Sequence, residues 1–351
     1  SPRAAAGELA LMLQDAEPAL LIAASSLVDR LPAPQRLPRA CLRFAVGDVA
    51  DAGCEPFAEL MRAEPLLQPH AAAEDDLAVL LYTSGTTGRP KGAMLTHLNI
   101  VHSVLHFAQA AGLRADDRSI VAVPLAHVTG LVAQMYSSVY CGAAMVLMPQ
   151  FRAAEFVRLA AAERMSWVIL VPAMYNLCLL QPGFATADLS AWRIGGYGGA
   201  PMPVATIDAL AARLPQLTLV NAYGATETTS PTTMIPMGQT RGHADTVGVP
   251  LPAARVKVMD DDGHELPVGE TGELWIAGPM VVPGYWANTE ATAASFTAGW
   301  WHSGDLGSID ADGFVRVFDR KKDMLNRGGY KVYSVEVENV LMAWPGMVEA
   351  A

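Results

Sequence analysis

One pattern recurs along the chain from residue 77 to residue 227: a short apolar run ends abruptly in a loop rich in Gly, Pro or Thr. Runs of this kind, apolar throughout and bounded by chain-breaking residues, are typical of strands that are buried on both faces. The pattern therefore predicts a sheet at the centre of the fold. Its expected strands are Leu77–Tyr82, Ser119–Val123, Ala143–Met148, Trp167–Val171, Ile194–Tyr197 and Leu217–Val220.

Segments with a helix-forming composition lie between these runs. Thr96 is a suitable N-cap for one helix and Gly112 a suitable end. Further helices are expected at Phe151–Arg164 and Val204–Leu214. Strands that alternate with helices indicate a mainly parallel α/β sheet, in which ligands bind outside the carboxyl ends of the strands. The apolar residues of the first helix that share one face are Leu98, Val101, Leu105 and Ala108.

Near Arg255 the rhythm changes to short strands separated by turns rich in Asp and Gly. These segments read as hairpins, so a β-rich, barrel-like subdomain is expected over residues 251–319, after an α/β body that ends near residue 250. At the start of the sequence, a helix at Glu8–Asp15 is expected to lead into a strand at Ala19–Ala23. Near its end, Val335–Ala343 has the pattern of an amphipathic helix.

The composition narrows the class of protein. Hydrophobic residues make up 52% of the 351 residues, which suits a packed core. A net charge of −11 disfavours binding to a nucleic-acid backbone. The sequence has no apolar run of about 18 residues, so no membrane span is expected. Since the cysteines are scattered, a reducing, cytoplasmic location is expected. The cysteines are Cys41, Cys54, Cys141 and Cys178.

The most informative segment is Tyr82–Gly92, which reads YTSGTTGRPKG. Its hydroxyl and amide groups are donors for phosphate oxygens, its glycines let the backbone approach a polyanion closely, and Lys91 adds positive charge. It is not a Walker A loop, because that motif leads from Gly-Lys-Ser/Thr into a helix, whereas Pro90 precedes Lys91 here. The expected phosphate-contacting residues are Thr83, Ser84, Gly85, Thr86, Thr87 and Gly88.

This segment resembles the phosphate-binding signature of the adenylate-forming superfamily, which includes acyl- and aryl-CoA synthetases, adenylation domains of nonribosomal peptide synthetases and beetle luciferases. The block Asn221-Ala222-Tyr223-Gly224-Ala225-Thr226-Glu227 resembles the second signature of that family. By this resemblance, the Tyr223 ring stacks on the adenine, Thr226 binds the α-phosphate and Glu227 holds Mg²⁺. Magnesium usually takes only one or two carboxylates from a protein.

Further blocks resemble the family in the same order along the chain. Gly198-Gly199-Ala200-Pro201 resembles the loop that lines the adenine and the acyl-adenylate. In the block Trp301–Asp305, Asp305 matches the residue that binds the ribose hydroxyls. The resemblance also assigns Arg320 to the ribose, Lys322 to the hinge of a small C-terminal domain, and Gly328, Gly329 and Tyr330 to a loop on the CoA side.

The segment Pro124–Gly130 resembles the carboxylate pocket of the family, and His127 occupies a position at which many CoA ligases carry His. No acidic residue occurs between Pro124 and Gly130, which disfavours an α-amino acid as substrate. Because Tyr197 would shorten the pocket, an aryl or short-to-medium acyl acid is favoured over a long chain. The expected lining residues are His127, Val128, Met174, Tyr197, Gly198 and Val249.

The resemblance implies an ATP-dependent carboxylic acid–CoA ligase. A carboxylate attacks the α-phosphate of ATP, pyrophosphate leaves, and the thiol of CoA displaces AMP from the acyl-adenylate. The alternatives are an adenylation domain that loads a carrier protein and an inactive nucleotide-binding fragment. The identity of the acid, a context in fatty acid metabolism and the oligomeric state are left open. The implied catalytic residues are Lys91, His127, Thr226 and Glu227.

The implied organisation is a large domain over residues 1–319, followed at 320–351 by the hinge and the beginning of a small α+β C-terminal domain. Relatives carry more sequence at both ends, including a C-terminal lysine that closes on the α-phosphate. Lys331 is the last lysine here and does not match it, so we expect the chain as given to adenylate poorly. The central expectation is that the turn beginning at Thr83 and the carboxylate of Glu227 hold one nucleoside triphosphate from opposite sides.

Overall fold

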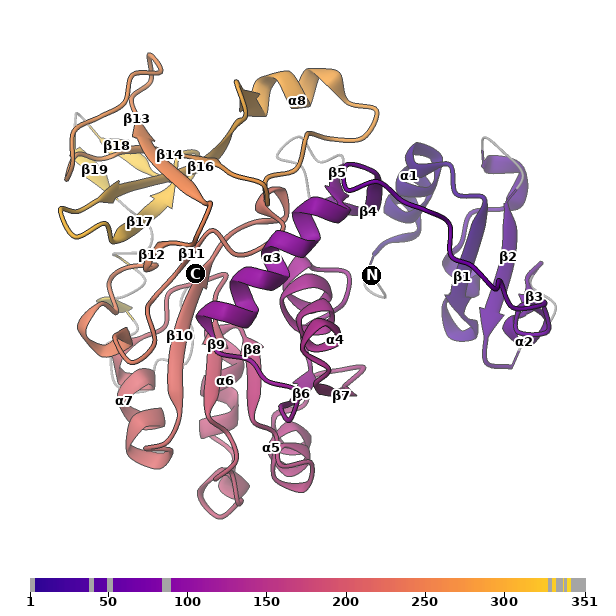
Figure 1. The fold of residues 1–351 in the computed structure, drawn as a ribbon, viewed down its shortest axis with the longest axis horizontal. Helices are drawn as coiled ribbons and strands as arrows, with labels where there is room; N and C mark the ends of the chain where they lie inside the picture. The colour runs from indigo at the N-terminus through magenta and orange to yellow at the C-terminus, as the bar shows by residue number, and fades with distance from the viewer. Residues whose placement is uncertain are drawn as a thin grey trace. The chain divides into compact units, whose positions relative to one another are not determined.

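The computed structural model describes residues 4–37, 41–48, 53–83, 90–327, 330–332, 337, 340 and 341. The chain forms two compact units. The first consists of Ser1–His97 and Gly284–Thr292, and the second of Leu98–Pro283 and Ala293–Ala351. Figure 1 shows both; the part of the first unit before residue 98 is indigo and violet.

The first unit begins with a helix and a small parallel sheet. Helix α1 (Ala6–Ala16) leads into β1 (Leu20–Ala24), as the sequence predicted. Strand β1 pairs in parallel with β2 (Leu42–Val46), which pairs with β3 (Glu55–Pro56). The short helical segments are η1 (Ser25–Arg30), η2 (Pro34–Arg36) and α2 (Phe57–Leu60).

The same unit contains a hairpin that corrects one prediction. Strand β4 (Leu77–Thr83) pairs antiparallel with β5 (Lys91–Thr96) in a sheet of their own, with Thr83 opposite Lys91. The run Leu77–Tyr82 is therefore not a strand of the parallel sheet, and Leu77 is 40% exposed. The reason is local: the chain resumes an apolar, extended segment at once after the loop, without the crossover helix that a parallel pair requires.

The second unit is built around a seven-stranded sheet in the order β12-β11-β10-β9-β8-β6-β7. Its five parallel strands confirm the predicted α/β sheet. They are β6 (Arg118–Val121), β7 (Ala144–Leu147), β8 (Trp167–Leu170), β9 (Ile194–Tyr197) and β10 (Thr218–Tyr223). Antiparallel strands β11 (Thr233–Met234) and β12 (Val249–Pro250) complete it. Strand β7 lies at an edge and is not buried on both faces, since Leu147 is 61% exposed.

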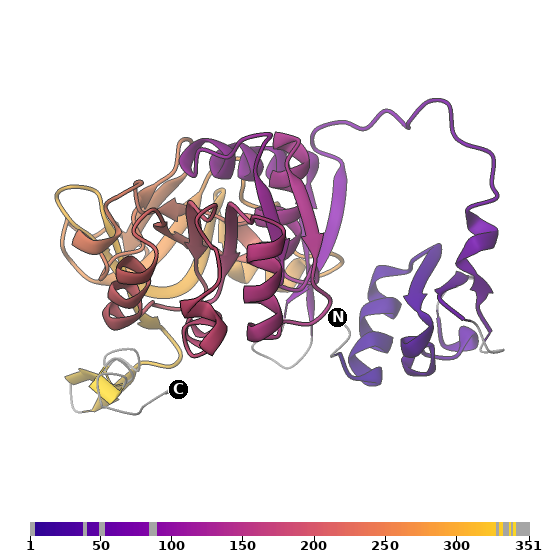
Figure 2. The same cartoon turned by 90° about the horizontal axis from the view of Figure 1, so that it is seen from below.

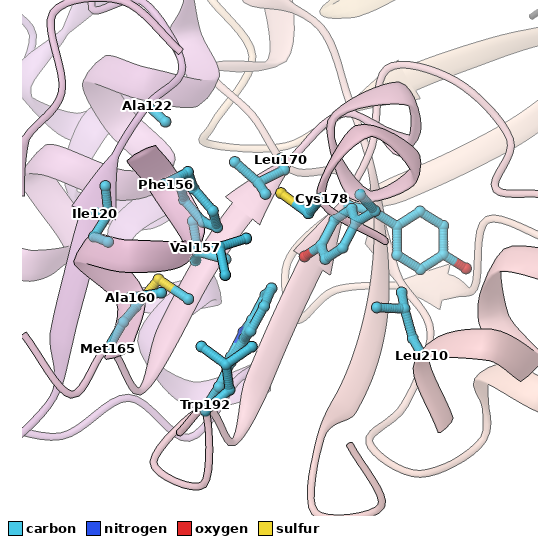
Figure 3. Packing of buried hydrophobic residues seen from close by; sticks show 14 of the residues in the cluster. Ile120, Ala122, Phe156, Val157, Ala160, Met165, Leu170, Cys178, Trp192 and Leu210 are labelled. Carbon is cyan, nitrogen blue, oxygen red and sulfur yellow. The ribbon is translucent and has the colours of Figure 1, made fainter. Parts of the chain in front are cut away.

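Helices cover both faces of this sheet, as Figure 2 shows. Along β8, Val168 and Leu170 join one buried cluster while Trp167 and Ile169 join another, because successive side chains of a strand point to opposite faces. The first cluster, shown in Figure 3, packs against α5 (Ala153–Ala162), α6 (Pro172–Leu179) and α7 (Val204–Arg213). The second packs against α3 (His97–Ala110) and the π-helix η3 (Thr129–Tyr136). Shorter helical segments are α4 (Ser137–Cys141), η4 (Pro182–Ala185), η5 (Thr226–Thr228) and η6 (Thr240–Gly242).

Helix α3 lies where Thr96 and Gly112 predicted it, but it buries a different face. Val101 is 52% exposed, whereas Val104 and Phe107 are 4% and 3% exposed. The helix is apolar around most of its circumference, so the apolar pattern alone does not choose between faces. The buried face also carries polar side chains that hydrogen-bond to neighbouring loops.

A curled antiparallel sheet follows, in the order β13-β14-β16-β15 with β17 on the other side of β16. Its hairpins confirm the predicted β-rich segment, and β13 and β14 begin at the predicted residues. The strands are β13 (Arg255–Met259), β14 (Gly272–Ala277), β15 (Phe296–Thr297), β16 (Trp300–Ile309) and β17 (Val315–Arg320). Helix α8 (Thr289–Ser295) precedes β15, and β18 (Leu325–Arg327) pairs with β19 (Tyr330–Val332).

Within the described residues, we find no helix whose length and apolar character would let it cross a membrane. Most of the expected helix at Val335–Ala343 lies outside the described residues.

Candidate active site

The parallel strands of the second unit bring several predicted site residues to one edge of the sheet. Strands β6, β8, β9 and β10 run in the same direction, so the loops that follow them leave from the same edge. His127 and Gly198 lie on the loops after β6 and β9, Met174 lies on helix α6 after β8, and Tyr223 is the last residue of β10. In open α/β sheets this edge is where ligands bind.

The loop after β9 lies very close to the end of strand β10. Tyr197 and Asn221 are opposite each other in the register of the two strands. A Cβ atom on Gly198 would lie only 2.3 Å from the carbonyl oxygen of Ala222, so only glycine fits there. Beyond it, Ala200 and Pro201 are exposed, as a ligand-contacting loop requires. The Asn221 amide donates to the carbonyl oxygen of Thr246 at 3.1 Å and so fixes the end of β10.

Tyr223, Asp305 and Arg320 form a connected group although they lie far apart in the sequence. The Tyr223 hydroxyl donates to Oδ2 of Asp305 at 2.6 Å. Nε of Arg320 lies 2.8 Å from Oδ1 of the same carboxylate. Asp305 on β16 and Arg320 on β17 are direct partners in the antiparallel register, which explains why residues fifteen apart meet. The three residues were predicted separately, and the structure brings them together.

Burial dominates the electrostatics of this group. Asp305 is 5% exposed, and its burial raises the pKa of the carboxyl group. The positive charge of Arg320 and the hydrogen bond from Tyr223 oppose that shift, while the charges of Glu273 and Glu227 add to it. Burial, followed by the charge of Asp305, also raises the pKa of the Tyr223 hydroxyl. The Tyr223 hydroxyl therefore keeps its proton and donates it in the hydrogen bond to Asp305.

Glu227 lies on the short turn η5, directly after β10. It is 9% exposed, and its carbonyl oxygen accepts a hydrogen bond from the amide of Val282 at 2.9 Å. Its negative charge contributes to the raised pKa of Asp305, so the two carboxylates lie in one electrostatic environment. Gly224 permits this tight turn, because a Cβ atom there would lie 3.1 Å from the Cα atom of Pro231.

Two supporting residues were missed by the sequence analysis. The Ser303 hydroxyl accepts a hydrogen bond from the amide of Asp305 at 2.9 Å, and the Ser303 carbonyl accepts one from Arg320 at 3.3 Å. Oε1 of Glu273 accepts the amide of Gly304 at 3.1 Å. Ser303 sits inside the Trp301–Asp305 block, so its place in that block was a usable signal. Glu273 offered none, since only strand pairing brings it near Asp305.

The predicted acyl-pocket residues differ in burial, from exposed to fully buried. His127 is exposed near the end of the loop after β6, while Val128 is 8% exposed. The π-helix η3 begins next, and π-helical turns occur often at functional sites. Tyr197 is 1% exposed, and among the described residues no group hydrogen-bonds its hydroxyl. Met174 on α6 and Val249 on β12 are both partly buried.

The phosphate-loop predictions fall on the first unit. Thr83 ends β4 and Lys91 begins β5, so they flank the loop. Nζ of Lys91 lies 5.0 Å from the centre of the Tyr285 ring, a cation–π contact. The predicted residues Ser84, Gly85, Thr86, Thr87 and Gly88 lie outside the described residues. Because Thr83 and Glu227 belong to different units, the expectation that they hold one triphosphate stays a prediction.

The hinge predictions fall at the end of β17 and beyond. Lys322 is exposed on the turn after β17. Tyr330 lies in β19, with its side chain outside the described part, and Gly328 and Gly329 are not described.

Known proteins share both sequence and fold with this chain. The profile of the AMP-binding enzyme family matches residues 1–286. A feruloyl-CoA synthase from Amycolatopsis sp is 37% identical over 277 residues, which are 79% of this chain and 56% of that relative. The chain thus spans little more than half the length of this relative.

Solved structures extend the likeness to nearly the whole chain. The anthranilate CoA ligase AuaEII, in complex with anthranoyl-AMP, is similar with a TM-score of 0.92 and 26% identity, covering 99% of this chain and 67% of that one. The O-succinylbenzoate CoA synthetase MenE from Bacillus subtilis, in complex with ATP and magnesium, has a TM-score of 0.83 and 28% identity, covering 99% and 68%.

Proposed function

Because this chain belongs to the AMP-binding enzyme family, we propose that it is part of an ATP-dependent carboxylic acid–CoA ligase that forms an acyl-adenylate and then an acyl-CoA. The observation that carries the proposal is the Tyr223–Asp305–Arg320 group beside Glu227. It gathers, at the ligand-binding edge of the sheet, the side chains that the family resemblance assigns to one nucleotide.

Each member of the group suits a part of AMP. The little-exposed Asp305 carboxylate would accept hydrogen bonds from the two hydroxyls of a ribose, and the charge of Arg320, itself half exposed, opposes the rise in the pKa of Asp305 that burial causes. The Tyr223 ring is fixed by its hydroxyl and offers its face to a purine. Gly198 and Gly199, with Ala200 and Pro201, would line the other side of the adenine.

Glu227 is the residue that would hold Mg²⁺. Its carboxylate suits a divalent cation for two reasons. It is little exposed, and its negative charge raises the pKa of a second carboxyl group, that of Asp305. Magnesium favours carboxylate and phosphate oxygens and usually takes few protein ligands. When bound, Mg²⁺ would neutralise charge on the phosphates.

The chemistry joins two anions, so the protein has to screen charge and hold the reactants in line. A carboxylate oxygen attacks the α-phosphorus of ATP, the bond to the bridging oxygen breaks, and pyrophosphate leaves. The thiol of CoA then attacks the acyl carbon and AMP leaves. Thr226 would donate to the α-phosphate, and Lys91 with the loop after Thr83 would contact the departing phosphates. The role of Lys91 rests on the sequence resemblance alone.

An aromatic acid is the substrate class that we propose. Tyr197 closes the end of β9 with a buried ring, which suits a short, flat acyl group, and Met174 is adaptable. The feruloyl-CoA synthase and the anthranoyl-AMP complex are relatives with aromatic acids in their names. His127, Val128, Gly198 and Val249 would complete the pocket.

The organisation of the whole protein is also a proposal. We place the end of the large domain at residue 319 and the hinge at Lys322, with Gly328, Gly329 and Tyr330 on the CoA side. The scattered reduced cysteines support a cytoplasmic location.

The test measures pyrophosphate and AMP release with a panel of aromatic and aliphatic acids, with CoA or a phosphopantetheinyl carrier protein as the thiol. We expect AMP formation that depends on an aromatic acid and on CoA. AMP formation with the carrier protein alone would favour a carrier-loading domain. Release of ADP and inorganic phosphate, independent of any acid, would contradict the proposal.

A further inference from the structure

The buried face of α3 carries three polar side chains. Asn99, Ser103 and His106 are 4%, 0% and 3% exposed. Their spacing places them on one side of the helix, over two turns. Burying polar groups costs free energy unless they are hydrogen-bonded, so a polar row at this position calls for an explanation.

The partners of this row are backbone carbonyls of two loops. The Ser103 hydroxyl donates to the carbonyl oxygens of Thr229 and Ser230. The Asn99 amide nitrogen donates to the carbonyls of Pro279 at 2.8 Å and Val281 at 3.0 Å. Neither pair of acceptors belongs to regular secondary structure, so α3 ties down two loops that the sheet does not hold.

Both loops are directly connected to Glu227, one through the chain and the other through a backbone hydrogen bond. Thr229 directly ends the turn η5 that carries Glu227, and its amide bonds to the carbonyl of Thr226 at 3.0 Å. On the other side, the residue after Val281 is Val282, whose amide donates to the carbonyl of Glu227 at 2.9 Å. The backbone on either side of the Glu227 carboxylate is therefore fixed from α3.

The turn itself is strained, which explains why it needs this support. Thr229 and Ser230 have φ values of 52° and 53°, in the left-handed region that non-glycine residues rarely adopt. Each such residue costs about 1 kcal/mol or more and persists only where its surroundings hold it. Two consecutive left-handed residues direct their carbonyls to the same side, and here that side faces the Ser103 hydroxyl.

We propose that Ser103, assisted by Asn99, is a positioning residue for the Glu227 carboxylate and so sets the affinity of the enzyme for magnesium-bound ATP. The inference rests on the proposed function, in which Glu227 holds Mg²⁺. Residues that orient a metal ligand from behind typically change metal affinity by about 10–100-fold when they are replaced. AMP without metal does not need Glu227, and the residues assigned to its base and ribose, Tyr223 and Asp305, lie outside the turn η5, so its binding depends on Ser103 less than that of magnesium-bound ATP.

The experiment titrates the 351-residue chain with ATP in excess Mg²⁺ and, separately, with AMP in the presence of a chelator, by calorimetry. The test variant is Ser103→Ala. Its matched control is Ser138→Ala, which also removes a hydroxyl from a fully buried helical serine, but a hydroxyl that has no hydrogen-bond partner among the described residues. Ser103→Cys keeps the shape and a weaker donor, and replaces Ser103→Ala if the latter does not fold.

We expect Ser103→Ala to weaken magnesium–ATP binding at least tenfold and to leave AMP binding within about twofold of wild type. Ser138→Ala should not show this selective loss of magnesium–ATP binding. Ser103→Cys should be intermediate. An equal loss for both nucleotides, or no loss for either, would overturn the inference while leaving the proposed function intact. If the wild-type chain binds neither nucleotide, the proposed function fails and the inference fails with it.

Discussion

Replacing Asp305 by Asn separates nucleotide recognition from folding in the site. The variant keeps the size and shape of the side chain but removes its charge. Asp305 accepts hydrogen bonds from Tyr223 and pairs with Arg320, and the proposed ligand adds two ribose hydroxyls. Asn offers one oxygen acceptor where the carboxylate has two, so one hydroxyl loses its partner.

The expected magnitude follows from these contacts. A hydrogen bond to a charged group contributes about 1.5–3 kcal/mol, which corresponds to a loss of about 10–150-fold in affinity. The cost to stability is small, for two reasons. The Arg320 side chain is 53% exposed, so its ion pair is screened by solvent. Burial holds the pKa of Asp305 above its unfolded value, so its contribution to stability is complete only below the unfolded pKa and is lost as the pH rises through the folded one.

The assay compares AMP with its 2′,3′-dideoxy analogue on the wild-type chain and on Asp305→Asn, with the free energy of unfolding measured by urea denaturation. The wild type should bind the dideoxy analogue at least tenfold more weakly than AMP. The variant should prefer AMP over the dideoxy analogue much less than the wild type does, and unfold at neutral pH within about 1 kcal/mol of wild type. A variant that distinguishes the two nucleotides as strongly as the wild type would refute the assignment of Asp305 to the ribose.

Three further predictions concern the same unit. Gly198→Ala should abolish AMP binding, because its Cβ atom would lie 2.3 Å from the Ala222 carbonyl and the loop would separate from the strand; unchanged affinity in calorimetry would contradict this. Tyr223→Phe should lower the free energy of unfolding by about 1–3 kcal/mol, since it removes a donor from the buried Asp305 carboxylate; urea denaturation measures it, and an unchanged midpoint would show that the bond contributes nothing. Burial lowers the pKa of His106 against the opposing backbone groups of Pro252 and Pro231, so the unfolded chain binds the proton more tightly and the unfolding free energy should fall as the pH drops below about 6.5. His106→Gln should flatten that dependence, which denaturation at pH 8 and pH 5.5 would reveal.

The sequence was sufficient for those parts of the fold in which local pattern and tertiary structure agree. Five of the six apolar runs became parallel strands, because a run such as Trp167–Val171 has no polar face and fits the inside of a sheet. The turns between antiparallel strands were recognisable from their Asp and Gly residues. The motif that begins at Asn221 was predicted to follow a strand that ends at Val220; in the structure β10 extends to Tyr223, so the first three residues of the motif belong to the strand.

Other features could not be predicted, because they depend on contacts between segments that are far apart in the sequence or on how two strands pair. Helix α3 has apolar residues on more than one side, and its buried face was decided by loops that supply carbonyl partners for Asn99 and Ser103. The pairing of β4 with β5 depends on the short connection between them rather than on the composition of β4. The contact between Asp305 and Arg320 depends on register, which is a property of two paired strands and not of either alone.

The proposed chemistry leaves a chemical trace that distinguishes an acyl-adenylate from other ways of activating an acid with ATP. When an acid whose carboxyl oxygens are ¹⁸O reacts through an acyl-adenylate, one of these oxygens stays on the phosphorus after the acyl group has left. We predict that the chain, incubated in stoichiometric amount with ATP, Mg²⁺, CoA and an ¹⁸O-labelled aromatic acid, transfers the acyl group to the CoA thiol and releases AMP that carries one ¹⁸O by mass spectrometry, and that Glu227→Gln does not. Unlabelled AMP, or ¹⁸O found only in inorganic phosphate, would contradict the proposal that this chain activates carboxylic acids as adenylates.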